Sequence, residues 1–277
     1  MSTNKCKSFP RRLQAALVAV AIASCFGTSS AQSPSPAGKG IAAISQSAAT
    51  GKYAFVFFYR EGGSLAGRLF SREKTAQTEE LRAMFRVVMG NMATKADAIE
   101  VNAGDPAEKD IVQQYDVSRA PMPLVLAIAP NGAITRGFPG KFTEQDLMNA
   151  FATPVLEKCL KVLQNRGLVL LCIQNAKTRL NEAAMKGVTE FKADPRFGQA
   201  VEIVKVDPSD TAESKLLNQF KVDPNTKDAM TVILAPPGSV LASFVGPTDK
   251  DVMIAKVTSS VSGCGSSCAP GQCGPAK

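Results

Sequence analysis

Residues 107–117, AEKDIVQQYDV, recur in altered form at residues 212–222 as AESKLLNQFKV, 105 positions later. A second pair follows, because IAPNGAITRGFPG at 128–140 aligns with LAPPGSVLASFVG at 234–246, which lies 106 positions later. Solenoid repeats have periods of roughly 20–50 residues, so this much longer period indicates a duplicated domain. The chain has 277 residues, 45% of them hydrophobic, which is enough for two such domains with a core each.

The first copy, from Lys52 on, predicts alternating strands and helices. YAFVFFY at 53–59 is an unbroken apolar run, typical of a strand that is buried on both faces. The residues that follow predict a helix over 73–89, a short strand at 98–101, a helix over 106–115, a hairpin that turns at 130–132, and a closing helix. Thr143 is the expected N-cap of that last helix, with Asp146 at its third position.

This order of elements, with a proline entering the hairpin, resembles the thioredoxin fold. The residues that carry the resemblance are YDV at 115–117 followed by PLVLAIAPNG at 123–132, and Pro123 occupies the place of the family's cis-proline. Pro139-Gly140 before the closing helix is also similar. The resemblance implies an α/β protein of two tandem thioredoxin-like domains, each a central mixed sheet flanked by helices, over residues 51–153 and 154–260.

The chain departs from this family where the family's chemistry takes place. The family carries C-x-x-C between its first strand and helix, where the helix N-terminus lowers a thiol's pKa. The corresponding loops here, REGGSLAG at 60–67 and QNAKT at 174–178, hold no cysteine, and Ala229 stands where Pro123 stands in the first copy. Ser64 is not a substitute nucleophile, because the chain has no His to activate it. Neither copy is expected to exchange disulfides at this site.

Two cysteines fall inside the second copy. Cys159 shares a predicted helical face with Val155 and Leu163, and Cys172 lies within the apolar strand LVLLCI at 168–173. Free cysteine behaves as a small buried hydrophobe, so both are expected in the core. The alternative is a Cys159–Cys172 disulfide, which depends on their separation.

The N-terminus has the three zones of an export signal: basic residues up to Arg12, an apolar run over 13–23, and small residues that end at Ala31. Cleavage after Ala31 would remove a signal peptide of residues 1–31. Alternatively, IASC at 22–25 resembles a bacterial lipobox, in which signal 1–24 is removed and Cys25 is lipidated. Either choice places the protein in the bacterial periplasm or cell envelope, with a lipid anchor as its one expected tie to the membrane. Residues 32–50 are expected to be a flexible linker.

The charge excludes one class of partner. Four basic residues of the leader account for half of the formal net charge of +8 and leave +4 for the mature chain. The remaining charges are scattered, so nucleic acid is not an expected partner.

The C-terminal tail, residues 261–277, holds Cys264, Cys268 and Cys273 among Gly, Ser and Pro, with too little apolar content to pack. Three soft thiolates suit Cu(I) or Zn(II), which are the expected cofactors if the chain holds any. The same thiols equally suit one disulfide with a third thiol left for a partner, or an oxidised and inert tail.

Three functions are consistent with these features. The first is a redox-inactive binding module, in which the loop at Met122 and Pro123 offers a strand edge to an exported protein or peptide. The second is soft-metal handling by the tail. The third is a thiol–disulfide oxidoreductase that uses the tail cysteines, and this is the form that any enzymatic activity is expected to take.

Overall fold

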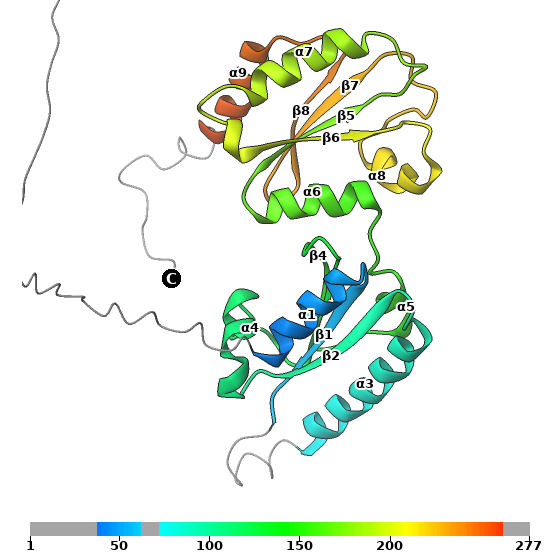
Figure 1. The fold of residues 1–277 in the computed structure, drawn as a ribbon, viewed down its shortest axis with the longest axis vertical. Coiled ribbons are helices and arrows are strands. Elements are labelled where there is room, and N and C mark those ends of the chain that lie inside the picture. The colour runs from blue at the N-terminus through cyan, green and yellow to red at the C-terminus, as the bar shows by residue number, and fades with distance from the viewer. Residues whose placement is uncertain (1–37, 62–71, 263–277) are drawn as a thin grey trace, which may run out of the picture. The chain divides into compact units, whose positions relative to one another are not determined.

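The computed structural model describes residues 38–61 and 72–262, which form two mixed sheets of four strands each (Figure 1). The first copy comprises α1 (Lys39–Ala49), β1 (Tyr53–Tyr59), α3 (Arg72–Asn91), β2 (Ala96–Asn102), the 3-10 turn η1 (Pro106–Glu108), α4 (Lys109–Gln114), β3 (Leu124–Ile128), β4 (Ile134–Pro139) and α5 (Glu144–Met148). The second comprises α6 (Pro154–Gln164), β5 (Leu168–Ile173), α7 (Asn181–Lys192), η2 (Gly198–Ala200), β6 (Val201–Val206), η3 (Thr211–Glu213), α8 (Ser214–Gln219), β7 (Met230–Ala235), β8 (Ser239–Val245) and α9 (Lys250–Ser262).

The two sheets have the same topology. The strand order is β2-β1-β3-β4 in the first and β6-β5-β7-β8 in the second. In each, the first two strands of the copy run parallel across a helical crossover, and the other neighbours are antiparallel. Each copy is therefore a thioredoxin-like domain, and the predicted fold is confirmed.

Alternation along β1 divides the first core into two layers. Tyr53, Phe55 and Phe57 pack with side chains of α3 and α5, whereas Val56 and Phe58 pack with those of α1 and α4 on the other face (Figure 1). The apolar run at 53–59 is buried on both faces, as its composition predicts.

In each copy, a buried glutamate from the sequence repeat binds the first turn of the opening helix. Glu108 and Glu213 occupy the same position of the two sequence repeats, and both are buried. Glu108 Oε2 accepts from the backbone N–H of Gly40, 3.0 Å away, and Glu213 Oε1 accepts from that of Val155, also at 3.0 Å. Each of these N–H groups lies in the first turn of the helix that opens its copy, where backbone donors lack helical partners.

The start of the first domain corrects one prediction. The linker expected over 32–50 contains helix α1, whose Ile41 and Ile44 pack against the first core. Ile41 and Ile44 are the only large apolar side chains of this helix, so its apolar stripe is narrow. The helix expected over 106–115 is two pieces, η1 and α4. At α5, Thr143 and Asp146 form the predicted capping box.

Candidate functional site

The loop before β3 carries the predicted binding residues of the first copy. The Met122–Pro123 peptide bond is cis, as predicted. Pro123 is buried, and its carbonyl accepts from the backbone N–H of Gly140 at 2.7 Å, which ties the loop to the end of β4. Met122 is half-buried and packs against the core layer beneath α1 and α4.

Arg60 fixes the same loop from the other side. It directly follows β1, and its guanidinium Nη2 donates to the carbonyl of Ser118. Arg60, Arg119 and Pro121 are exposed, so the loop lies at the surface and its conformation is held from two directions.

The equivalent segment of the second copy is residues 227–229. It is tied to the last strand by the same backbone hydrogen bond, but its outer backbone groups have a different environment. Gly246 N–H donates to the Ala229 carbonyl at 2.7 Å, as Gly140 does to Pro123. Here, however, the chain also pairs with itself: Arg179 N–H donates to the Lys227 carbonyl at 2.8 Å, and Ala229 N–H donates to the Arg179 carbonyl at 3.0 Å. Residue 228 is thereby bridged to Arg179 in the manner of an added strand.

Side chains reinforce this closure. The Arg179 guanidinium binds both carboxylate oxygens of Asp228, at 2.9 and 3.2 Å. Upstream, the Asn175 side chain donates to Asp207 at 2.7 Å, and Thr178 Oγ1 donates to Asn181 Oδ1 at 2.7 Å. Hydrogen bonds from Ser209 and Asn175 lower the pKa of Asp207. The loop that replaces C-x-x-C in the second copy is therefore a closed polar network.

The first copy differs at the matching position. Within residues 38–61 and 72–262, no backbone hydrogen bond joins Met122 to another residue. Met122 occupies the place of Asp228, so one edge is filled by its own chain and the other is not filled by any described residue.

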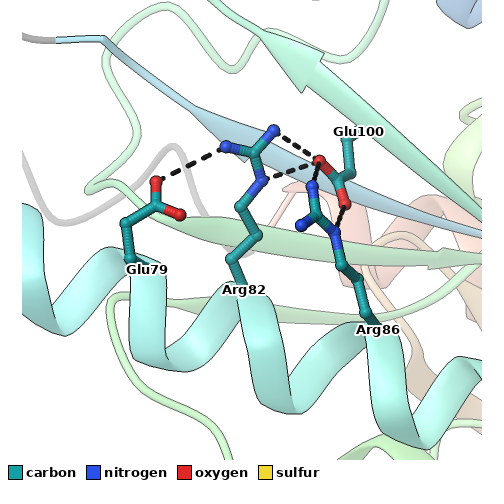
Figure 2. Close-up of polar contacts among 4 residues, drawn as sticks. All are labelled: Glu79, Arg82, Arg86 and Glu100. Atoms are coloured by element: carbon teal, nitrogen blue, oxygen red, sulfur yellow. Dashed lines mark hydrogen bonds and ion pairs between the residues drawn. The ribbon is translucent and has the colours of Figure 1, made fainter.

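Beside the end of β1, two arginines of α3 hold the edge strand β2. Figure 2 shows the guanidinium groups of Arg82 and Arg86 turned toward the carboxylate of Glu100. Arg82 Nε lies 2.7 Å and Arg86 Nη2 2.8 Å from Glu100 Oε2, and the Arg82 guanidinium also stacks 4.3 Å from the Tyr59 ring centroid. The hydrogen bond from Arg86 lowers the pKa of Glu100, with Arg82 adding to it against the opposing effect of partial burial. Sequence reasoning missed this cluster, although the spacing of Arg82 and Arg86 places both on one helical face.

The two cysteines of the second copy are core residues. Cys159 and Cys172 are unpaired, and each is at most 2% exposed. They pack in different clusters, because Cys159 faces β5 from α6 whereas the Cys172 side chain points to the layer of α7 and α9. Burial raises the pKa of the Cys159 thiol to about 12 and that of Cys172 to about 11. The core prediction is confirmed, and the alternative of a disulfide is wrong.

The remaining predicted residues, Cys25, Ser64, Cys264, Cys268 and Cys273, lie outside the described residues. In the part of the chain that the structure describes, no three His, Cys, Asp or Glu side chains come together as a metal site would require. Across those same ranges, no helix combines the length and the apolar character that a bilayer crossing needs.

Comparison with known proteins gives weak structural likenesses. No protein-family model and no curated protein matches the sequence. The first two thioredoxin domains of Saccharomyces cerevisiae Eps1p align over 80% of this chain and 97% of theirs, with 9% identity and a TM-score of 0.25. The zinc-bound form of human ERp44 aligns over 82% of this chain and 58% of its own, with 11% identity and a TM-score of 0.32. A domain of the alkylhydroperoxide reductase AhpF from Enterococcus faecalis aligns over 77% and 97%, with 12% identity and a TM-score of 0.23. With TM-scores this low the likenesses carry no argument, and the fold assignment rests on the strand order and connections of the chain itself.

Proposed function

We propose that this chain is an exported, redox-inactive tandem thioredoxin-like protein that binds extended segments of other exported proteins or peptides. The binding site is the backbone edge at Met122 and Pro123 in the first copy. The observation that carries the proposal is the geometry of the matching edge in the second copy. In the second copy Arg179 lies on the edge and takes up its backbone groups, so the geometry there accepts an extended strand.

The first copy supplies the features that such a site needs. Its loop is held at both ends, by Arg60 on the Ser118 carbonyl and by Gly140 on the Pro123 carbonyl, which limits the ordering cost when a partner binds. Main-chain hydrogen bonds to an edge give affinity with little sequence selectivity, and the half-buried Met122 adds an apolar contact.

A fluorescently labelled unfolded protein, carboxymethylated α-lactalbumin, tests the proposal by anisotropy. Met122→Arg places a bulky charge at the edge, and we expect at least a ~10-fold weaker affinity, about 1.4 kcal/mol. Val87→Arg is the matched control, because it adds the same charge at an exposed apolar position on α3, and it should leave the affinity unchanged. Equal binding by wild type and Met122→Arg, or no binding by the wild type, would contradict the proposal.

The tail carries a second candidate function. Since Cys159 and Cys172 are buried with raised pKa values, thiol or soft-metal chemistry in the mature chain falls to Cys264, Cys268 and Cys273. These thiolates would bind Cu(I) or Zn(II), with a ligand set completed by solvent or by a second molecule, or would exchange disulfides with a partner. Metal titration and thiol counting distinguish the two: about one metal ion per reduced chain supports metal handling, whereas a single reactive tail thiol in the exported protein supports a disulfide. The triple Cys→Ser variant should lose either property.

A further inference from the structure

The two domains differ in what lies beside the last strand of the sheet, β4 in the first copy and β8 in the second. In the first copy, the outer side of β4 is covered at Ile134. The Ile134 N–H donates to Gln164 Oε1 at 2.9 Å, and Gln164 Nε2 donates back to the Ile134 carbonyl at 2.6 Å. The amide of Gln164 thus satisfies the same two groups that a neighbouring strand would. β4 also carries Arg136 and Pro139, both of which discourage edge pairing.

None of these protections is present on β8. Its sequence, SVLASFV at 239–245, contains no charged residue and no proline. Val240, which corresponds to Ile134, is 50% exposed, and Val245, which corresponds to Pro139, is 65% exposed. Among the described residues, β8 is the last strand of its sheet and pairs only with β7.

The exposed side chains and the free backbone groups of β8 belong to the same residues. The inward N–H of Gly246 donates to Ala229, so alternation along the strand turns the backbone groups of Val245 and Ser243 outward. Val240, Ser243 and Val245 lie opposite Leu234, Val232 and Met230, which face the layer of α6 and α8. The uncovered edge therefore carries an apolar strip.

A further exposed apolar side chain lies near the end of the strand, beside Gly246. Leu180 is 50% exposed, and its Cδ1 would lie 3.3 Å from a Cβ placed on Gly246, next to Val245. Val240, Val245 and Leu180 make up three of the six large hydrophobic side chains that are exposed in the described ranges. Such clustering at an open, uncharged edge is typical of an interface.

The order of the two copies in the chain accounts for this difference within the described ranges. Gln164 belongs to α6, the helix that opens the second copy, and it covers the edge strand of the copy before it. In the described part of the chain no third copy follows β8 to supply an equivalent helix.

We propose that β8 pairs antiparallel with β8 of a second copy of this chain, joining the two second-copy sheets across a two-fold axis. Two-fold contacts are self-complementary, and a strand without charges sets no like charges opposite each other when it pairs with itself. Antiparallel pairing also brings Val245 of one copy toward Val240 of the other. In a head-to-tail contact, α1 of a second chain would have to cover β8 as α6 covers β4. The contacts of Glu108 and Glu213 align α1 with α6, so Ala49 takes the position of Gln164. The alanine side chain has no amide to pair with the strand, so this contact is less suited.

One short strand with two exposed valines forms a small interface, below the standard ~800 Å² per partner. We therefore expect a dimer that depends on concentration. Analytical sedimentation of the full chain measures the dimerisation at protein concentrations from low to several hundred micromolar. A reductant in the buffer prevents interference from tail disulfides. We expect Val245→Lys and Ser243→Lys each to weaken dimerisation at least ~10-fold. Val87→Lys is the matched control, since Val87 is also 65% exposed but lies in helix α3 of the first copy, where the backbone groups are paired within the helix, and it should dimerise like the wild type.

Two results would overturn the proposal: a wild type that stays monomeric throughout, or a dimer that persists in both β8 variants. Thermal melts check that both variants remain folded, which the exposure of Val245 leads us to expect. The dimer is independent of the peptide site, so Met122→Arg should lose peptide binding and keep dimerising.

Discussion

The two copies share a fold and a set of anchors, but among the described residues they differ in which backbone edge has a partner. The first copy covers the outer edge of β4 with Gln164 and leaves Met122 without a backbone partner among the described residues. The second fills the corresponding position with Arg179, and its strand β8 pairs with β7 alone in the part of the chain that the structure describes. An unpaired edge is a place where another chain can add, and the two proposals above assign a peptide to the first copy and a second copy of this chain to β8. The fold alone would not have shown this, because the strand orders are the same.

The largest expected difference between the copies is in thiol protection. Cys159 and Cys172 lie in the second copy, whereas no cysteine lies in the first. Both thiols are buried and have raised pKa values, so their alkylation requires that the second copy unfold. We expect iodoacetamide to modify them several orders of magnitude more slowly than the same residues in urea. Mass spectrometry of peptic fragments measures this, and rapid labelling of either cysteine in the native protein would contradict the burial.

All three tyrosines, Tyr53, Tyr59 and Tyr115, lie in the first copy, so their fluorescence reports on that copy while the cysteines report on the other. These two sets of intrinsic probes allow the stability of each domain to be followed in one chain.

Substitution of the buried glutamates is expected to have the next largest effect, a loss of folding stability that differs between the two copies. Glu213 accepts from both the Thr153 hydroxyl and the Val155 N–H, whereas Glu108 accepts from the Gly40 N–H. Removing Glu213 leaves two donors without a partner, so Glu213→Ala should destabilise the second copy by about 2–3 kcal/mol. Glu108→Ala should cost the first copy about 1 kcal/mol. Urea unfolding, followed by cysteine labelling and by tyrosine fluorescence, measures both. Equal losses in the two variants would show that the extra contact in the second copy contributes nothing.

The sequence predicts the parts of this molecule that depend on local chemistry. The apolar run at 53–59, the hairpins and the Thr143–Asp146 capping box follow from periodicity and from side-chain hydrogen bonding over three residues. The core positions of Cys159 and Cys172 follow from their apolar neighbours. Helix α1 escaped prediction because its few apolar side chains are separated by small and polar residues.

What distinguishes the two copies could not be predicted in the same way. Arg179 with Lys227 and Gln164 with Ile134 join residues that are far apart in the sequence, and nothing in either residue's neighbours indicates its partner. The buried glutamates are an intermediate case. Each lies within a repeat that the sequence shows plainly, and a carboxylate kept at one position of two otherwise divergent repeats is itself a signal.

The smallest expected effect on folding stability comes from the ion pairs that attach a helix to an edge strand in each copy. Glu100 in the first copy is 21% exposed and binds two arginines, whereas Glu202 in the second is 57% exposed and binds Lys192 alone, at 2.6 Å. Exposed pairs contribute little, because water and salt screen them. We expect Glu100→Gln to cost about 1 kcal/mol and Glu202→Gln less than about 0.5 kcal/mol, measured by urea unfolding.

The pH dependence separates this ion-pair effect from a packing effect. Arg86 and Arg82 lower the pKa of Glu100 from its ordinary value of 4.5 in the folded state. A carboxylate with a lowered folded pKa stabilises the native state fully above its unfolded pKa and loses that contribution as the pH falls through the folded one. The stability gap between wild type and Glu100→Gln should therefore be constant from neutral pH down to about 5 and should close below about 4. A gap that stays the same in acid would mean that Glu100 acts through its shape rather than its charge. In that case the first copy would keep the contribution of Glu100 at low pH, and the difference in how the two copies hold their edge strands would not depend on the charge of this carboxylate.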